Sequence, residues 1–209
     1  AMQKTGITPD FISVDGGEGG TGAAPIEFTN SVGTPLEDGL TFVLDMLVGF
    51  GLKDQIKIIA SGKAFSAFHV LCRMALGADL VYSARGFLLS LGCIQALRCN
   101  SNECPTGITT NRPGLVRGLV VPLKADRVFR FHEDTMKALA EMLGAMGLEG
   151  HDDLIRSHIN RRISRLDVMT YEQMYPAVTQ GSFMNGDIPK KYSKYIPMAE
   201  AESFSEVRL

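Results

Sequence analysis

The most chemically specific feature of this sequence is a group of three cysteines, Cys93, Cys99 and Cys104, in the pattern C-x5-C-x4-C followed by Pro105. On one continuous helix Cys93 and Cys99 would point in different directions and could not converge. The segment must therefore turn between these two cysteines, and the polar run Asn-Ser-Asn at 100–102 supplies turn-prone residues for a loop. A short loop with three thiols that ends in proline resembles the loops that bind iron–sulfur clusters. Three thiolates suit a cubane cluster with one empty corner, because each of its remaining irons needs one sulfur ligand from the protein.

Two other roles are compatible with these thiols, structural packing and zinc binding. Zinc sites usually pair cysteines in CxxC spacing with a fourth ligand nearby, and this loop contains no histidine. Cys72 stands apart in an apolar stretch, which is typical of a buried core residue. Disulfides are not expected, since the sequence shows no charged-then-apolar leader and has only four cysteines in 209 residues. We therefore predict a cluster role for the three-cysteine loop.

A second group of candidate residues follows the predicted strands. Ser-Gly-Lys at 61–63 comes after one apolar run, and Ala-Arg-Gly at 84–86 comes after the next. In parallel α/β proteins ligands collect at the carboxyl ends of strands, and backbone amides at a helix amino end attract phosphate. The alternative is that the glycines only permit tight turns and that the cations are solvated. The predicted phosphate-binding residues are Gly62, Lys63, Ala84, Arg85 and Gly86.

A glycine-rich loop at 15–22 contains the pattern G-x-G-x-x-G at Gly17, Gly19 and Gly22. A dinucleotide-binding loop of this kind requires a helix that opens within the motif, whereas helical periodicity begins near residue 37. We predict instead that the backbone at Gly16 and Gly17 approaches a flat cofactor or substrate, because glycine has no side chain to block contact. An NAD(P)-binding dehydrogenase is the alternative, and it requires a helix that starts within residues 17–25.

The elements that must hold these residues alternate between strand and helix. Strand-type runs alternate with runs of helical periodicity, each helix ending near a glycine. Such alternation predicts right-handed βαβ units and a parallel sheet, hence an α/β fold. The predicted strands are 11–14, 56–60 and 80–83, and the predicted helices are 37–50, 64–76 and a third from 86 towards Cys93.

After the cysteine loop the regular alternation stops. A long amphipathic helix is predicted at 125–146, and a short helix at 152–160, with an irregular remainder interrupted by prolines. Such an apolar stripe is far more often core than a cofactor site. The stripe predicted to be buried on the long helix is Val128, Phe131, Leu139, Met142 and Met146.

Composition limits the function classes without naming one. The chain is 45% hydrophobic and 21% charged with a formal net charge of -2, which is too balanced to favour nucleic acid or an acidic membrane surface. No apolar stretch reaches membrane-spanning length without charge, so no membrane segment is predicted. Four cysteines without secretory features favour a reducing interior such as the cytoplasm.

Several motifs together resemble one known family. They are the run from Asp15 to Pro25, the Ser-Gly-Lys loop at 61–63, the cysteine run at 92–107, and the tail motifs at 158–162 and 171–176. Taken together, they are similar to the synthase domain of glutamate synthase, and most closely to the FMN-binding glutamate synthase family. The resemblance extends over nearly the whole chain, and the three-cysteine motif is its most specific part.

The resemblance implies a (β/α)8 barrel that binds FMN and a [3Fe-4S] cluster. By position Cys93, Cys99 and Cys104 match the cluster ligands, and residues 41–93 match the stretch that contacts FMN. The sequence departs from the larger enzymes at 61–63, where they usually carry an Asp-Gly-Gly type sequence, and this affects the details of FMN contact. A barrel of this type needs about 250 residues, so three βα units predict the carboxyl-terminal part of a (β/α)8 TIM barrel.

Within that part we expect two regions. Residues 1–121 would carry the barrel units with the phosphate and cysteine loops, and residues 122–209 would form a helical, partly irregular extension packed on the barrel. The rest of the barrel would carry most contacts to 2-oxoglutarate.

The resemblance also implies an activity. Electrons from ferredoxin or a reductase subunit would pass through the cluster to FMN, which would reduce the imine of 2-oxoglutarate and ammonia to L-glutamate. The sequence shows no amidotransferase segment, so ammonia would come from another chain or from solution. Two alternatives stay open: an NAD(P)-binding dehydrogenase, and a non-catalytic electron-transfer or interaction fragment.

A few isolated polar residues have two possible roles each. His69 and His132 lie on predicted helices, where packing is the expected role. Asp15 and Glu18 either contact substrate or flavin, or fix turns in the glycine loop. A basic cluster near the carboxyl end would either dock an acidic electron donor or form a solvated helix face with local ion pairs. Its members are Arg156, His158, Arg161, Arg162 and Arg165.

Overall fold

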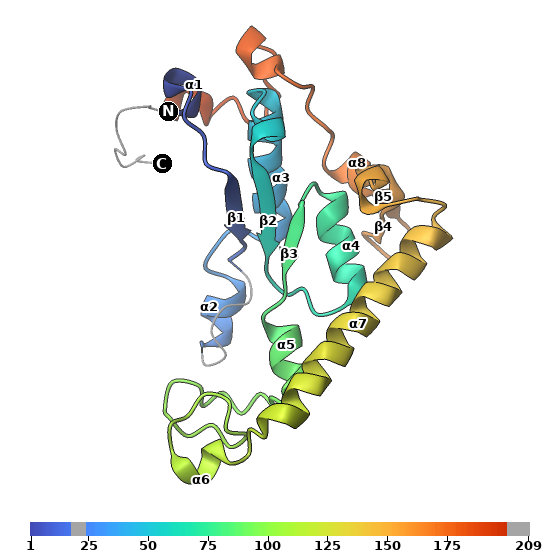
Figure 1. Ribbon diagram of the computed structural model, residues 1–209. Helices are drawn as coiled ribbons and strands as arrows, with labels where there is room; N and C mark the ends of the chain where they lie inside the picture. The colour runs from blue at the N-terminus through green and yellow to red at the C-terminus, as the bar shows by residue number, and fades with distance from the viewer. Residues whose placement is uncertain (18–23, 200–209) are drawn as a thin grey trace.

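The computed structural model describes residues 1–17 and 24–199, and its centre is a three-stranded parallel sheet (Figure 1). The strands are β1 (Phe11–Asp15), β2 (Lys57–Ser61) and β3 (Leu80–Tyr82), in the order β1-β2-β3. Helix α3 (Leu36–Gly49) joins β1 to β2, and α4 (Ala67–Ala75) joins β2 to β3. The predicted βαβ units and the predicted parallel sheet are therefore confirmed.

The remaining elements precede and follow this unit. The other helices up to residue 145 are α1 (Met2–Thr5), α2 (Ile26–Asn30), the 3-10 helix η1 (Lys53–Gln55), α5 (Arg85–Ser90), α6 (Pro113–Val116) and α7 (Val121–Ala145). The C-terminal segment contains η2 (His151–Asp153), η3 (Arg156–His158), β4 (Asn160–Arg162), β5 (Val168–Thr170), α8 (Tyr171–Met174), η4 (Ser182–Asn185) and η5 (Ile196–Met198). Strands β4 and β5 form a separate antiparallel pair.

One face of the parallel sheet forms the core together with α3 and α4. Successive side chains of a strand point to opposite faces, and the register aligns Val14 with Ala60 and Ala60 with Val81. Val14 and Ala60 are buried in the same cluster as Leu40 of α3 and Leu71 of α4. Burial of this helix-facing side is what fixes the strand register.

The opposite face of the sheet is largely uncovered. Phe11, Leu80 and Tyr82 remain 54%, 56% and 51% exposed, although they belong to the strands at the centre of the fold. In Figure 1 this face is turned towards the viewer, with α3 behind it. Parallel sheets occur almost only where both faces are covered, so the exposed side is the unusual feature of this fold.

All three strands end at the same edge of the sheet. The register places Asp15, Ser61 and Tyr82 side by side at their carboxyl ends. Helices α2 and α5 and the loop that carries the cysteines lie at this end, in the lower half of Figure 1. The fold therefore brings the predicted ligand loops to one side of the molecule.

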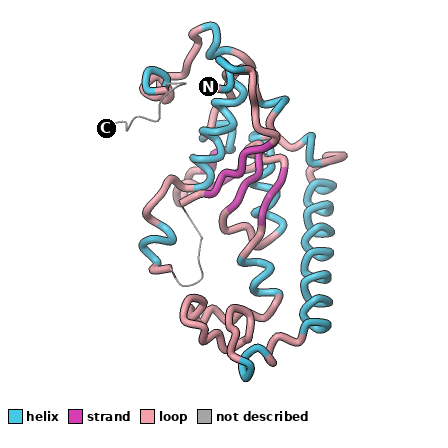
Figure 2. Tube along the Cα trace, turned by 60° about the vertical axis from the view of Figure 1, so that its left-hand side comes forward, coloured by secondary structure: helices cyan, strands magenta, loops and turns pink. Residues whose placement is uncertain are grey.

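Helix α7 packs along α4 and α5, and Figure 2 shows it running beside the rest of the fold. Leu139 is buried, and the Phe131 ring meets the Phe87 ring edge-on at a centroid distance of 5.4 Å. Of the stripe predicted to be buried, Leu139 alone is buried. Val128, Phe131 and Met142 are half-buried, and Met146 lies beyond the end of the helix and is 38% exposed. Among the described residues, no helix has both the length and the apolar character that a membrane crossing requires.

The predicted helix at 152–160 is wrong. This stretch forms two short 3-10 turns and then enters β4. Leu154 and Ile159 are 7% and 3% exposed, and on an α-helix residues at this spacing would point to different sides. The irregular turns allow both to reach the core while Arg156 meets a buried carboxylate. The predicted irregular remainder also contains β5 and α8.

Candidate functional site

The loops that follow β1 and β2 touch one another at the carboxyl edge of the sheet. The Gly16 N–H donates to the Ser61 carbonyl at 3.3 Å. Beyond Ser61 the backbone turns through left-handed conformations at Gly62, with φ 145°, and at Lys63, with φ 46°. A lysine in this region is strained, so the loop after β2 has a special geometry where the phosphate site was predicted.

Three of the predicted cofactor-binding glycines have a packing role. A Cβ on Gly16 would lie 2.6 Å from the Leu36 Cα, and a Cβ on Gly17 would lie 2.3 Å from the Gly33 Cα. A Cβ on Gly86 would lie 2.6 Å from the Ser83 Oγ. Close approach within the protein thus accounts for glycine at these positions, and contact with a cofactor stays a prediction.

Part of the glycine-rich loop lies outside the described residues, including Glu18, Gly19 and Gly22. The first helix described after it, α2, begins at Ile26, which is beyond the range that the dinucleotide alternative requires. Asp15 is exposed at the end of β1, next to Ser61 in the register.

A cavity of 690 Å³ lies beside these strand ends. Its wall includes Ser61 and Ser83 from the strand ends, Phe87 of α5, and Phe131 and His132 of α7. The wall is mainly apolar, and the His132 ring stacks against Phe87 at 6.2 Å, which confirms its predicted packing role. Ala84, one of the predicted phosphate-binding residues, lines this cavity. Lys63 and Arg85 are half-buried and are sequence neighbours of the cavity residues Ala64 and Ala84.

The cysteine loop departs from helical conformation earlier than predicted. Helix α5 ends at Ser90, so Cys93 lies on the loop rather than on the helix. Non-glycine residues adopt left-handed backbone at Gln95 (φ 55°), Leu97 (φ 55°) and Asn102 (φ 61°). Such conformations cost of order 1–3 kcal/mol each and cluster at functional sites. The backbone is not helical between Cys93 and Cys99, and it forms a turn at 99–102, where the turn-prone residues were predicted.

Polar contacts of the loop support this shape. The Asn102 Oδ1 accepts from the Asn111 N–H at 2.6 Å and from the Thr110 hydroxyl at 3.1 Å. Glu103 pairs with Arg112 at 3.2 Å and with Arg98 at 3.6 Å. The turn before Cys104 is thus attached to the segment that leads into α6.

The environment of Cys104 favours a thiolate. Its side chain is buried, and its Sγ lies 3.2 Å from the Thr106 Oγ1. Burial raises the pKa of this thiol, but hydrogen bonds from Thr106 and Thr109 outweigh it and lower the pKa to about 6. Cys93 accepts a weaker hydrogen bond from the Gln95 N–H at 3.4 Å. A thiolate is the form that binds metals.

The three thiols do not form a finished metal site. Across residues 1–17 and 24–199, no group of three or more His, Cys, Asp or Glu side chains is arranged to hold a metal ion. Cys93 and Cys99 are half-buried, whereas Cys104 is buried. The donor chemistry at Cys104 fits a metal cluster, but the convergence of Cys93, Cys99 and Cys104 on one point is not a feature of this structure. Cys72 is buried in the core, as predicted.

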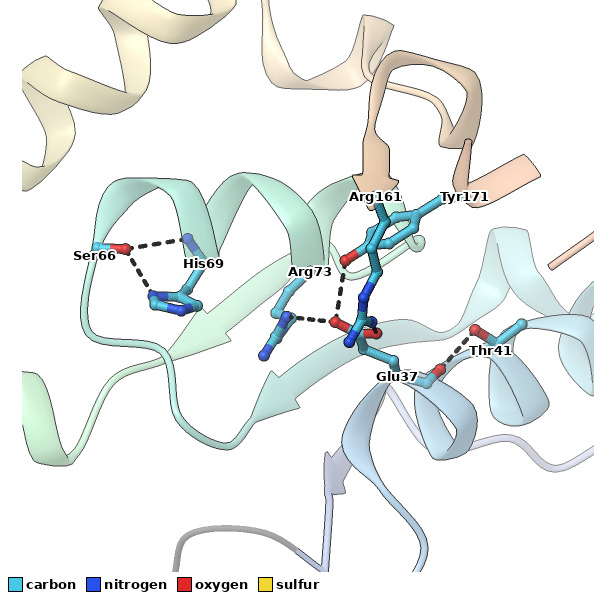
Figure 3. A network of polar contacts seen from close by, with 7 residues as sticks. All are labelled: Glu37, Thr41, Ser66, His69, Arg73, Arg161 and Tyr171. Atoms are coloured by element: carbon cyan, nitrogen blue, oxygen red, sulfur yellow. Dashed lines mark hydrogen bonds and ion pairs between the residues drawn. The ribbon is translucent and has the colours of Figure 1, made fainter. Parts of the chain in front are cut away.

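A second polar site, which the sequence did not predict as a unit, lies between α3, α4 and the C-terminal segment. Figure 3 shows Glu37 of α3 between Arg73 of α4 and two residues of the C-terminal segment, Arg161 and Tyr171. The Glu37 Oε1 accepts from the Arg73 guanidinium at 3.2 Å and from the Tyr171 hydroxyl at 3.0 Å. The Glu37 Oε2 accepts from Arg161. This network borders a cavity of 760 Å³.

Titratable groups with shifted pKa values gather around this cavity. Burial, followed by the positive charge of Arg73, lowers the pKa of His69, whose Nδ1 lies 2.7 Å from the Ser66 hydroxyl. Burial raises the pKa of the Cys72 thiol and of the Tyr171 phenol, and it raises that of Tyr175 to about 12. Groups of this kind in a cavity mark a candidate functional site, although ion-pair networks of purely structural role produce them too.

The arginine cluster near the carboxyl end is not a solvated helix face. Arg156 is 8% exposed and donates to the buried Asp45 of α3 at 2.8 Å, so it is not available to a docking partner. Arg161 is bound to Glu37, while Arg162 and Arg165 are exposed on and after β4. The density of arginines at 156–165 was the one sequence signal that pointed towards this part of the molecule.

Comparison with known proteins gives the family. The family model described as the conserved region in glutamate synthase matches residues 1–149. The glutamate synthase large subunit-like protein YerD of Bacillus subtilis is 40% identical over 158 residues, which cover 76% of this chain and 30% of that protein. The archaeal glutamate synthase [NADPH] of Methanocaldococcus jannaschii is 39% identical over 145 residues, covering 69% of this chain and 28% of that protein.

Two further proteins are more distant. The chloroplastic ferredoxin-dependent glutamate synthase of Oryza sativa subsp. japonica is 31% identical over 172 residues, which cover 82% of this chain and 10% of that protein. A solved structure of a mutant flavocytochrome b2 with pyruvate bound is 14% identical with a TM-score of 0.44, covering 88% of this chain and 35% of the other.

The chain thus spans less than a third of the length of the two most similar of these relatives. The family model covers well over half of it and includes the sheet, the strand-end loops and the cysteine loop. This chain therefore belongs to the glutamate synthase family.

Proposed function

We propose that these residues form part of a glutamate-synthase-type oxidoreductase that makes L-glutamate from 2-oxoglutarate and ammonia by way of 2-iminoglutarate. Bound FMN would supply the hydride chemistry, and a [3Fe-4S] cluster would supply electron transfer from ferredoxin or a reductase subunit. Family membership over residues 1–149 is the observation that carries this proposal. It is supported by the similarity to an archaeal glutamate synthase [NADPH] and to a ferredoxin-dependent glutamate synthase.

We also propose that the sheet is part of a (β/α)8 barrel. In such a barrel, the helix-facing side of each strand packs outward and the other side faces the barrel interior. Phe11, Leu80 and Tyr82 lie on the uncovered face of the sheet. Their exposure is what we expect of positions inside a barrel when the other strands of that barrel are not part of these residues. β1 and β3 are the edges of the sheet, where further parallel strands would pair.

In this assembly the strand-end loops would hold FMN. The loops after β2 and β3 would supply backbone amides and two cations to the phosphate, and the loop after β1 would lie against the flavin. The left-handed backbone at Gly62 and Lys63 supports a special role for the first of these loops. The residues that would act are Gly16, Gly17, Gly62, Lys63, Ala84, Arg85 and Gly86.

Cys93, Cys99 and Cys104 would hold the cluster. Metal binding often creates its own site, because a preformed set of ligands is rarely stable without the metal. The lowered pKa of Cys104 favours ligation at that position. We place the protein in a reducing compartment such as the cytoplasm, where free thiols persist.

The test uses full-length protein purified without oxygen. Its visible spectrum is expected to show flavin bands and broad iron–sulfur absorption, and the reduced flavin should be oxidised on addition of 2-oxoglutarate and ammonium. Replacing Cys99 by serine should lower bound iron while flavin is retained, whereas Cys72→Ala should leave iron unchanged. Full iron content in the Cys99→Ser variant would contradict the cluster assignment. Failure of both substrates together to oxidise the flavin would contradict the proposed reaction.

A further inference from the structure

The end of the molecule that carries the cysteine loop is strongly basic. Residues 93–130 contain six arginines and lysines against two carboxylates, which gives this stretch a net charge of +4 in a chain whose formal net charge is -2. The stretch comprises the cysteine loop, α6 and the first turns of α7, which lie together at the lower end of Figure 1, away from the sheet. The basic residues are Arg98, Arg112, Arg117, Lys124, Arg127 and Arg130.

The two carboxylates leave half of these cations without a partner. Glu103 lies 3.2 Å from Arg112 and 3.6 Å from Arg98. Asp126 pairs with Arg130 at 3.0 Å. Within residues 1–17 and 24–199 no side chain forms an ion pair or a hydrogen bond with the other three cations, so their charge acts on whatever approaches this end of the molecule. The three unpaired cations are Arg117, Lys124 and Arg127.

The unpaired cations lie against the cysteine loop. Gly92 is the residue before the first loop cysteine, and a Cβ on it would lie 2.9 Å from the Lys124 Nζ and 3.4 Å from the Arg127 Nη1. A Cβ on Gly118, next to the third unpaired cation, would lie 3.3 Å from the carbonyl oxygen of Thr106, which follows the last loop cysteine closely. Positive charge therefore flanks the loop at both ends, and a molecule that it attracts arrives beside the thiols.

Exposed apolar side chains lie among these cations. Ile94 and Leu97 of the cysteine loop are 66% and 56% exposed. Val121 and Leu123 at the start of α7 are 66% and 55% exposed. An apolar centre inside a charged rim is typical of protein–protein interfaces. Surfaces that bind single-stranded nucleic acid add aromatic rings for base stacking, and residues 93–128 contain no Phe, Tyr or Trp. The surface therefore favours an acidic protein over a nucleic acid.

We propose that this basic face, residues 93–130, is the docking site for a small acidic electron-carrier protein. The proposal rests on the proposed function, since docking beside the cysteine loop serves an electron acceptor held there. One electron leaves the reduced carrier and enters that acceptor, and no atom is transferred. Complementary charge raises the rate of encounter and sets the orientation of the carrier. The basic cluster at 156–165 is less suited, because Asp45 and Glu37 already engage two of its arginines.

The first test measures binding and does not depend on turnover. The sample is the full-length protein, and the probe is an oxidised acidic [2Fe-2S] ferredoxin. Isothermal titration is carried out at ionic strengths of about 0.01 M and 1 M, where charges act over about 30 Å and 3 Å. At the lower ionic strength Arg127→Gln should weaken binding about threefold, and adding Arg117→Gln should bring the loss to about tenfold. At 1 M the variants should not differ from the parent protein.

Lys137→Gln is the matched control for these variants. Lys137 is exposed on the same helix as Arg127 but lies outside the basic face, so the binding of ferredoxin should be unchanged. A basic cytochrome c should not bind. Equal losses in Arg127→Gln and Lys137→Gln, or ferredoxin binding that 1 M salt leaves intact, would overturn the docking site. An oligonucleotide that binds as tightly as ferredoxin would also overturn it, because the face would then select any polyanion.

A second test separates docking from the redox chemistry. Reduction of bound flavin by reduced ferredoxin, followed by rapid mixing, should slow about tenfold in the double variant at low ionic strength. Reduction by the methyl viologen radical cation should keep its rate, because a small cation needs no basic face. Reduction by viologen without ferredoxin binding would overturn the docking site and leave the proposed function standing. Ferredoxin binding at this face without flavin reduction by either donor would contradict the proposed function instead.

Discussion

At the scale of single residues, the C-terminal segment depends on two carboxylates of α3, Glu37 and Asp45. Glu37 accepts from Arg73, Arg161 and Tyr171, and Asp45 is 1% exposed with its own set of donors. Most of the side chains that donate hydrogen bonds to these carboxylates lie more than a hundred positions further along the chain. Sequence spacing carries no signal for such pairs.

Tyr171→Phe tests one of these bonds. The variant keeps the buried ring and removes the hydroxyl that donates to Glu37 at 3.0 Å. The free energy of unfolding should fall by about 1–2 kcal/mol, measured by urea denaturation of the full-length protein. Tyr195→Phe is the control, since Tyr195 is 38% exposed. Equal losses in the two variants would show that the Glu37 bond is not the cause.

His69 makes a prediction about pH. Burial and the charge of Arg73 lower its pKa in the folded protein, so the unfolded chain binds a proton more readily. Stability should therefore be lost as the pH falls below about 6.5, the ordinary histidine pKa. His69→Gln should reduce the slope of unfolding free energy against pH just below about 6.5, measured by denaturation at a series of pH values. His132→Gln, on the surface of α7, is the comparison, and an equal change there would refute the assignment.

Residue roles that depend on the neighbouring sequence were predicted correctly, whereas contacts between distant residues were missed. The turn before Cys104, the burial of Cys72 and the packing of His132 follow from neighbours in the sequence, and the structure confirms them. The network at Glu37 was missed because its members come from four separate elements, α3, α4, β4 and α8. The close contact between Gly17 and Gly33 was also invisible, since nothing in either glycine specifies its partner.

At the scale of elements, α3 connects the sheet to the C-terminal segment. One of its faces packs on β1 and β2, and Asp45 accepts from Arg156 at 2.8 Å, from the Tyr192 hydroxyl at 2.6 Å and from Lys191 at 3.2 Å. Phe183 packs so closely that a Cβ on Gly49 would lie 2.5 Å from its ring. The extension is therefore part of the folded unit rather than an appendage.

Asp45→Ala should show this directly. It leaves the Arg156 guanidinium, which is 8% exposed, without its carboxylate. Removing one partner of a buried ion pair costs about 3–5 kcal/mol, so the unfolding midpoint in urea should shift strongly. Asp54→Ala is the matched control, because Asp54 accepts an exposed contact from Gln180 at 3.3 Å. A loss no larger than that of the control would mean that Asp45 does not hold the segment.

Elements with strong periodicity were predictable, and those that depend on distant partners were not. The strands and the helices α3, α4 and α7 were found close to their observed bounds, because alternating or helical patterns mark a buried face. The prediction of a helix at 152–160 failed, because the pairing of Arg156 with the distant Asp45 overrides the local preference for helix. Strand β4 consists of Asn160, Arg161 and Arg162 and is exposed throughout, so it has no apolar run that would mark it as a strand.

At the scale of the whole molecule, the main feature is the uncovered face of the parallel sheet. Phe11, Leu80 and Tyr82 are each more than half exposed there, and both edge strands of the sheet lack an outer neighbour among the described residues. Exposed apolar surface next to unpaired strand edges favours association.

The prediction is that the segment 1–199, produced alone, self-associates and binds the dye ANS. The longer polypeptide that contains the rest of the proposed barrel should do neither. Sedimentation velocity and dye fluorescence provide the measurement. Replacing Leu80 by lysine should reduce association of the segment, and the same change at the exposed Leu166, which is 89% exposed on the β4–β5 turn, is the control. A segment that is monomeric and does not bind the dye would rule out an incomplete barrel.

The long separation between Asp45 and its donors also has a consequence for synthesis on the ribosome. Arg156 and Tyr192 follow Asp45 by 111 and 147 positions. At about 5–20 residues translated per second, α3 would wait roughly 5–30 s for them after it is made. During that interval the carboxylate must stay hydrated, so the nascent helix cannot settle fully onto the sheet. Final docking of α3 is therefore a late event, and translation pauses before residue 156 would prolong its exposure to chaperones.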